Sequence, residues 1–109
     1  MPNTFTKFTA THETLPDSIK NLITLIIRLI NPEEIILFGS RARGDHRENS
    51  DFDIVVKAPT ISPKNWAELQ LTVEETPITL FRVDLVDFNQ LDDKYKKRIS
   101  SEGKTLYAH

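Results

Sequence analysis

The sequence predicts an α/β (α+β) fold, in which helices pack on a small mixed β-sheet. Three segments carry apolar residues at helical spacing, and three short apolar runs rich in β-branched residues lie between them. The order along the chain is helix, strand, strand, helix, strand and helix, with a short edge strand expected at the end. This alternation is typical of one sheet covered by helices.

The composition fits one globular domain of ordinary size. The chain has 109 residues, of which 39% are hydrophobic and 28% are charged, and this is enough for one core. We expect a flexible N-terminal tail at 1–13 and a single domain at 14–109. The bulky apolar side chains of the tail are Phe5 and Phe8, which could also dock on the domain or on a partner.

Charge, cysteine content and hydropathy exclude several classes of protein. With 14 basic and 16 acidic residues the net charge is −2, which argues against a dedicated nucleic-acid-binding protein. The sequence has no cysteine, which excludes disulfides and thiolate metal sites. The longest apolar run, within Leu22 to Ile30, is too short for a membrane span, and the N-terminus lacks the pattern of a signal peptide. We therefore expect a cytoplasmic protein with no membrane partner and no direct nucleic-acid binding.

The first helix and the first strand follow one another directly. Pro16 favours the first turn of a helix, and Asn31-Pro32 ends it. The strand at Glu33 to Phe38 is apolar on both faces, which predicts a central position in the sheet. The apolar face of the helix is expected to comprise Ile19, Leu22, Ile23, Ile26, Leu29 and Ile30, widened by Leu25 and Ile27.

The second strand is expected at Asp51 to Lys57. The short connection predicts that it lies beside the first strand, as a hairpin-like pair or through one helical turn at Ser40 to Arg43. Ser62-Pro63 then provides a cap and a first turn for a second helix, which Thr76-Pro77 ends.

The last third of the chain is expected to form a strand, a helix and a short edge strand. Ile78 to Val86 is β-rich and alternates in character, so that Asp84 shares a face with Leu80 and Arg82. Asn89 can cap the last helix, and Lys104 to Ala108 is the expected edge strand. The apolar stripe of that helix consists of Leu91, Tyr95 and Ile99.

The stretch from Gly39 to Asp53 joins the first two strands and has the character of a metal-and-phosphate site. Asp51 and Asp53 are one residue apart, so in an extended strand both side chains point to the same face. Two aligned carboxylates repel each other unless a cation lies between them. Asp84 would complete a group of three acids if its strand lies beside this one, and three carboxylates suit Mg²⁺.

The other end of this stretch has residues suited to phosphate. Gly39 lets the backbone approach an anion closely, and Ser40 offers a hydroxyl and a backbone donor. Arg41 and Arg43 supply positive charge nearby, although solvated arginines explain the pattern equally well. Arg82 could reach a phosphate or pair with Asp84, and the acids taken alone could be solvated turn residues.

Gly39-Ser40, ten further residues and then Asp51-x-Asp53 resemble the signature of the DNA polymerase β-like nucleotidyltransferase superfamily. The fuller form, GSRARG followed by SDFDIVV, is similar to the minimal nucleotidyltransferase (MNT) family, whose members commonly pair with a HEPN-domain toxin. The strand with Asp84 looks like the third-carboxylate strand of the family, and ISSEGKTLY near the end is similar to its usual ending.

The resemblance implies an antitoxin that uses Mg²⁺, as two ions, and ATP as co-substrate. Asp51, Asp53 and Asp84 would be the catalytic and metal-binding residues, and Gly39, Ser40, Arg41 and Arg43 the nucleotide-binding ones. AMP would pass to a tyrosine of a cognate HEPN ribonuclease and silence it. Two other functions remain open, namely neutralisation by tight binding alone and nucleotidyl transfer to another acceptor, such as a small molecule or a nucleic acid.

Overall fold

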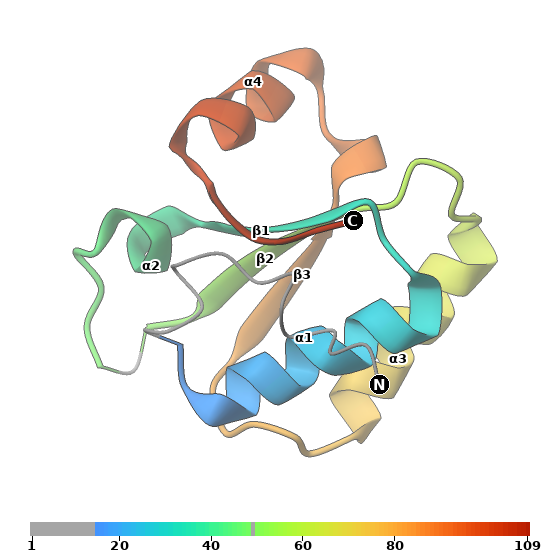
Figure 1. Ribbon diagram of the computed structural model, residues 1–109, viewed down its shortest axis with the longest axis horizontal. Helices are drawn as coiled ribbons and strands as arrows, with labels where there is room; N and C mark the ends of the chain where they lie inside the picture. Colours follow the sequence, from blue (N-terminus) through green and yellow to red (C-terminus); the bar gives the residue numbers. More distant parts are fainter. Residues whose placement is uncertain (1–14, 49) are drawn as a thin grey trace.

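The computed structural model describes residues 15–48 and 50–109, so the predicted tail at 1–13 lies outside the described residues. The helices and strands alternate as the sequence predicts, with a short helix added between the first two strands and a 3-10 turn before the last helix (Figure 1). In chain order they are α1 (Asp17–Ile30), β1 (Glu34–Phe38), α2 (Gly39–Arg43), β2 (Phe52–Lys57), α3 (Pro63–Glu75), β3 (Val83–Asp87), η3 (Phe88–Gln90), α4 (Asp93–Glu102) and β4 (Lys104–Ala108).

The four strands form one mixed sheet in the order β3-β2-β1-β4. β1 pairs antiparallel with both β2 and β4, which confirms its predicted central position. β2 pairs parallel with β3, and α3 makes the crossover between them. The two strands that carry the predicted acids are therefore neighbours.

The helices cover the two faces of the sheet unequally. α1 and α3 lie on one face, and α4 lies on the other (Figure 1). The larger core lies under α1 and includes Ile35, Ile54 and Leu106, none of which is exposed to solvent. The α4 face has a much smaller cluster of buried residues, made by Ile36, Val55 and Ile99.

α1 forms as predicted but with a slightly rotated apolar face. The helix ends at Asn31, which adopts a left-handed conformation with φ 45° and is followed by Pro32, as the helix-ending signal predicts. Ile27 is buried, whereas Leu29 is 48% exposed, so the prediction for Leu29 is wrong. Leu29 lies near the end of α1, where it lines a cavity instead of the core.

β3 is shorter than the β-rich stretch of the sequence. The prediction of a strand from Ile78 is wrong, because β3 pairs only with β2 and begins where that pairing begins, at Phe52 and Val83. Leu80 lies in the preceding loop and is fully exposed.

The last helix is capped by a different residue from the one predicted. The carboxylate of Asp92 accepts a hydrogen bond of 2.8 Å from the Tyr95 amide. Asn89 belongs to η3, and its side-chain amide donates to the Ala58 carbonyl instead. Ile99 is buried as expected, but Tyr95 of the predicted stripe is exposed.

Among the described residues, no helix has the length and apolar character that crossing a membrane requires.

Candidate active site

The predicted acids gather at one end of the sheet. β1 ends where antiparallel β2 begins, so Phe38 is the register partner of Asp53. Asp53 is in turn the register partner of Asp84 in parallel β3. Because side chains at paired positions share a face of a sheet, Phe38, Asp53 and Asp84 form a row across three strands on the α4 face.

Asp51 precedes β2 by one residue. Phe52 is 1% exposed and packs in the core under α1, so the acids on either side of it are directed away from that core. The carboxylate of Asp51 lies 3.9 Å from Nε of Arg82, with both side chains largely in solvent. Arg82 therefore pairs with Asp51, whereas the sequence offered Asp84 as its partner.

The environment of Asp53 raises the pKa of its carboxyl above the ordinary value. Burial is the largest cause, followed by the negative charges of Asp84 and Asp51, and the charge of Arg43 opposes them. Proximity to two other carboxylates disfavours the ionised form of Asp53. A divalent cation would relieve this repulsion, so the donor set fits Mg²⁺, which prefers carboxylate oxygens.

The acids are near one another but do not already form a complete ligand set. Across residues 15–48 and 50–109, no three or more His, Asp or Glu side chains have an arrangement that would hold an ion. The pairing of Asp51 with Arg82 contributes to this open arrangement. A metal ion bound by Asp51 would compete with its pairing to Arg82.

Gly39 fits this site because it has no side chain. Its φ of +72° is in the left-handed region, and a Cβ atom there would collide with Oδ2 of Asp53. The turn that follows β1 thus packs directly against the central acid. Ser40 follows in α2, whose end is marked by Gly44 at φ +83° with its N–H donating to the Ser40 carbonyl. Of the two connections that the sequence left open, the structure has the helical turn, at Gly39–Arg43.

The two arginines of α2 lie in different surroundings. Arg43 is half-exposed, pairs with Asp45 at 3.1 Å, and is close enough to Asp53 to oppose the rise in its pKa. The Arg41 guanidinium donates hydrogen bonds to the Ser50 and Glu48 carbonyls of the loop before β2. It also lies beside two aromatic rings. Both were predicted to bind nucleotide, and the surroundings of Arg43 suit that prediction better.

Sequence reasoning missed the aromatic contacts around these residues. Phe52 and Phe81 meet edge to face, with ring centroids 5.2 Å apart, and both lie beside the Arg41 guanidinium. On the α4 face, the Arg98 guanidinium lies 5.9 Å from the Phe38 ring, next in the register to Asp53. The only sequence signal for Arg98 was its place in the last turns of a helix, where cations are common.

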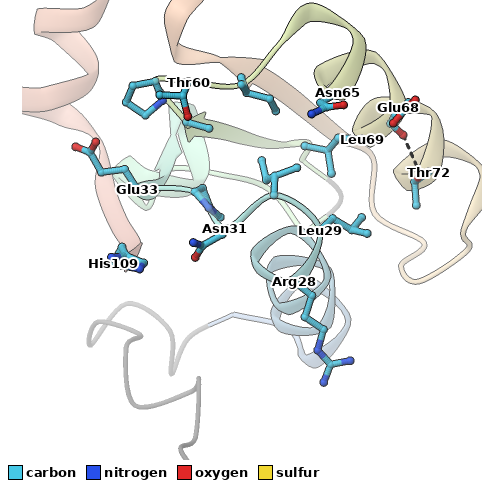
Figure 2. A pocket seen from close by; sticks show the side chains of 15 residues that line it. Arg28, Leu29, Asn31, Glu33, Thr60, Asn65, Glu68, Leu69, Thr72 and His109 are labelled. Atoms are coloured by element: carbon cyan, nitrogen blue, oxygen red, sulfur yellow. Dashed lines mark hydrogen bonds between the residues drawn. The ribbon is translucent and has the colours of Figure 1, made fainter.

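A cavity of about 880 Å³ lies at the opposite end of the sheet. Asn31, Glu33 and His109 line one side of it, and α3 lines the other side (Figure 2). These residues lie before β1 and after β4, whereas the acids lie at the starts of β2 and β3. The cavity contains none of the predicted site residues and is not part of the candidate site.

The chain is similar to nucleotidyltransferases both in sequence family and in structure. The family described as "Polymerase beta, Nucleotidyltransferase" matches residues 20–109. A crystal structure of a toxin–antitoxin with AMP-PNP is 30% identical, with a TM-score of 0.59, covering 83% of this chain and 73% of that one. A protein described as a minimal nucleotidyltransferase is 29% identical, with a TM-score of 0.64, covering 84% and 92%.

A third similar structure is a MntA-HpeT toxin–antitoxin in which two aspartates are changed to glutamate. It is 29% identical with a TM-score of 0.57, and the match covers 83% of this chain and 73% of that chain. No curated protein sequence matches. Because the family match spans the fold and the whole row of acids, the chain belongs to the polymerase beta nucleotidyltransferase family and is a nucleotidyltransferase.

Proposed function

We propose that this nucleotidyltransferase transfers AMP from ATP to a tyrosine hydroxyl of a HEPN-domain toxin and thereby neutralises it. One observation carries the proposal. Asp53 lies between Asp84 and the Gly39 turn, so a site for metal and a site for phosphate adjoin at one end of the sheet. The similarity to a toxin–antitoxin with AMP-PNP supports an adenine nucleotide and a toxin as partner.

The metal would be held by the three acids. Asp53 and Asp84 are register partners in the neighbouring strands β2 and β3, and Asp51 directly precedes β2. Mg²⁺, when bound, would supply positive charge that stabilises the phosphates and the charge that develops during transfer. The resemblance implies two ions, which Asp51, Asp53 and Asp84 would hold.

Gly39, Ser40 and Arg43 would bind the phosphates. Gly39 keeps the backbone close to the central acid, and Ser40, the next residue of α2, would add a hydroxyl. Arg43 brings a positive charge near Asp53 without a buried partner, since its pairing with Asp45 is at the surface. These groups would orient the α-phosphate toward the acceptor and stabilise the departing pyrophosphate.

Asp84 would act as the general base. A tyrosine hydroxyl has a pKa of about 10 and is a poor nucleophile near neutral pH. Asp84 is exposed, so an acceptor from outside the chain can reach it. The phenolic oxygen would form a bond to the α-phosphorus while the bond to pyrophosphate breaks, and the phenolic proton would pass to Asp84.

The proposal is tested by incubating the chain with its HEPN partner, ATP and Mg²⁺ and measuring the intact mass of the partner. We expect mass increments of AMP with the wild type, none with Asp53→Asn or Asp84→Asn, and unchanged increments with Asp93→Asn. Asp93 is a suitable matched control because it lies in the first turn of α4, away from the row of acids.

Two results would contradict the proposal. An unmodified partner that is nevertheless inactivated would point to neutralisation by binding alone, and Asp53→Asn would then neutralise as well as the wild type without nucleotide. AMP found only on a nucleic acid or a small molecule would point to a different acceptor.

A further inference from the structure

We propose that Arg41 is a positioning residue, which fixes the loop before Asp51 and the entry to β3, and is not a ligand of the nucleotide phosphates. The proposal deepens the proposed function, because it concerns the framework of the same site. It differs from the expectation that both arginines of the GSRARG stretch bind phosphate.

Three hydrogen bonds hold the Arg41 guanidinium against the loop. Nε donates to the Ser50 carbonyl at 3.2 Å, and Nη2 donates to the same carbonyl at 2.9 Å. Nη2 also donates to the Glu48 carbonyl at 2.9 Å. These acceptors are backbone oxygens, so the contacts fix the course of the chain rather than that of a side chain. Nε and Nη2 are therefore engaged within the chain and are directed at the loop.

The flat guanidinium also lies against two aromatic rings. Its carbon is 4.2 Å from the centroid of Phe52 and 5.3 Å from that of Phe81. Such contacts between a cation and a ring face are attractive, and more so where they exclude water. Phe52 is fully buried, so the stack attaches α2 and the loop to the core. The Phe52 N–H also donates to the Arg82 carbonyl, which joins β2 to the entry of β3.

Each acid of the site lies close in sequence to an Arg41 contact. Ser50 and Phe52 flank Asp51, Phe52 directly precedes Asp53, and Phe81 is three residues before Asp84. Arg41 itself is two residues after Gly39. One side chain thus touches the segments that carry all three carboxylates and belongs to the turn that would bind phosphate.

Lysine cannot replace arginine in this role. A planar guanidinium can stack on rings while donating sideways to two carbonyls, whereas an ammonium group is a compact point charge. A phosphate ligand depends mainly on positive charge, so Arg41→Lys should retain much of a phosphate-binding function. The two roles therefore predict different behaviour for the same variant.

The test compares Arg41→Lys and Arg41→Met with Arg43→Lys as the matched control. Amide hydrogen exchange is measured across 44–52, and kcat and KM for ATP are measured with the partner protein. We expect exchange in this segment to be about tenfold faster in both Arg41 variants and unchanged in Arg43→Lys. We also expect kcat to fall by about 10–100-fold, as is typical when a supporting contact of a metal site is removed, with KM for ATP within about twofold.

Three results would overturn the proposal: wild-type kcat in Arg41→Lys, a raised KM with unchanged exchange, or wild-type exchange in both Arg41 variants. Phe81→Leu provides a second route if Arg41→Met fails to fold, because it removes one ring and leaves the hydrogen bonds. It should accelerate exchange in the same segment by a smaller factor, and wild-type exchange there would count against the proposal. If the wild type transfers no nucleotide, the proposed function fails while the exchange data still decide the role of Arg41.

Discussion

Among the single residues of the site, Asp53 has a carboxyl group whose ionised form is disfavoured by its surroundings. Its pKa is raised mainly by burial and then by Asp84 and Asp51, so the native state binds its proton more tightly than the unfolded chain does. The contribution of this group to stability is therefore fully present below the unfolded pKa of 3.8 and is lost as the pH rises through the higher native value. At neutral pH the ionised carboxylate therefore destabilises the fold.

Replacing Asp53 with asparagine should therefore stabilise the metal-free protein at pH 7. We expect the melting temperature to rise by roughly 2–4 °C, which corresponds to about 0.5 kcal/mol in a domain of this size. The difference from wild type should close as the pH falls below the raised native pKa of Asp53, because the wild-type carboxyl is then protonated. Thermal unfolding followed by circular dichroism at several pH values measures this, with Asp93→Asn as control. A variant less stable than wild type at pH 7 would show that Asp53 is not under electrostatic strain.

Gly39 combines two constraints that can be separated by comparison with Gly44. Both have positive φ, but a Cβ on Gly39 would collide with Asp53, whereas a Cβ on Gly44 meets nothing within 4 Å. We expect Gly44→Ala to cost about 1 kcal/mol for its backbone conformation, and Gly39→Ala to cost about 1–3 kcal/mol and abolish transfer. Urea unfolding together with a transfer assay tests this. Equal effects of the two substitutions on transfer would show that the contact with Asp53 is unimportant.

Elements whose signals are local were predicted well, and elements defined by their neighbours were not. The turn after β1 and its partner strand follow from a glycine, a serine and two apolar runs that are close in sequence. β3 begins only where β2 pairs with it. The alternation of side-chain character in the sequence extends back to Leu80, which is exposed in a loop, and so it predicted too long a strand. The cap of α4 moved to Asp92 because Asn89 is part of the 3-10 turn.

The capping assignment can be tested on α4. Asp92→Ala should destabilise the domain by about 1 kcal/mol, because the Tyr95 amide loses its acceptor. Asp92→Asn should stay within about 0.5 kcal/mol of wild type, since asparagine is also a good cap. Chemical denaturation of the two variants measures both effects. An alanine variant as stable as wild type would mean that the helix begins elsewhere.

The role of Arg41 illustrates a different limit at this scale. Its charge and its place beside Gly39-Ser40 predict a phosphate ligand, and nothing local indicates otherwise. The Arg41 guanidinium contacts the carbonyl of Ser50, nine residues later in the chain, and the ring of Phe81, just before β3. The tertiary structure brings these groups together, and the sequence pattern alone cannot.

For the whole molecule, the unequal covering of the sheet leaves the site accessible. α4 covers the centre of its face through a small cluster, while the end that carries the acids remains at the surface, where Arg82 is 85% exposed. The acceptor can therefore approach from outside. β2 and β3 are neighbours, which is the condition that the sequence set for Asp84 to lie near Asp51 and Asp53.

Metal binding should stabilise the whole molecule. Mg²⁺ at about tenfold excess over its Kd adds about 1.4 kcal/mol to the stability of a protein that binds it only when folded, or roughly 6–11 °C here. We expect this shift in wild type and none in the Asp51→Asn/Asp53→Asn variant. Differential scanning fluorimetry against NaCl of equal ionic strength measures it. A shift of the same size in the double variant would place the metal elsewhere.

The proposed transfer of AMP is tested most directly with ATP labelled at one phosphate. The chain is mixed with its HEPN partner, Mg²⁺ and ATP that carries the label on either the α- or the γ-phosphate, and the partner is then denatured and counted. We expect covalent label on a partner tyrosine from α-labelled ATP only, with none when Asp53 is replaced by asparagine. Label from γ-labelled ATP, or no label on an inactivated partner, would contradict it.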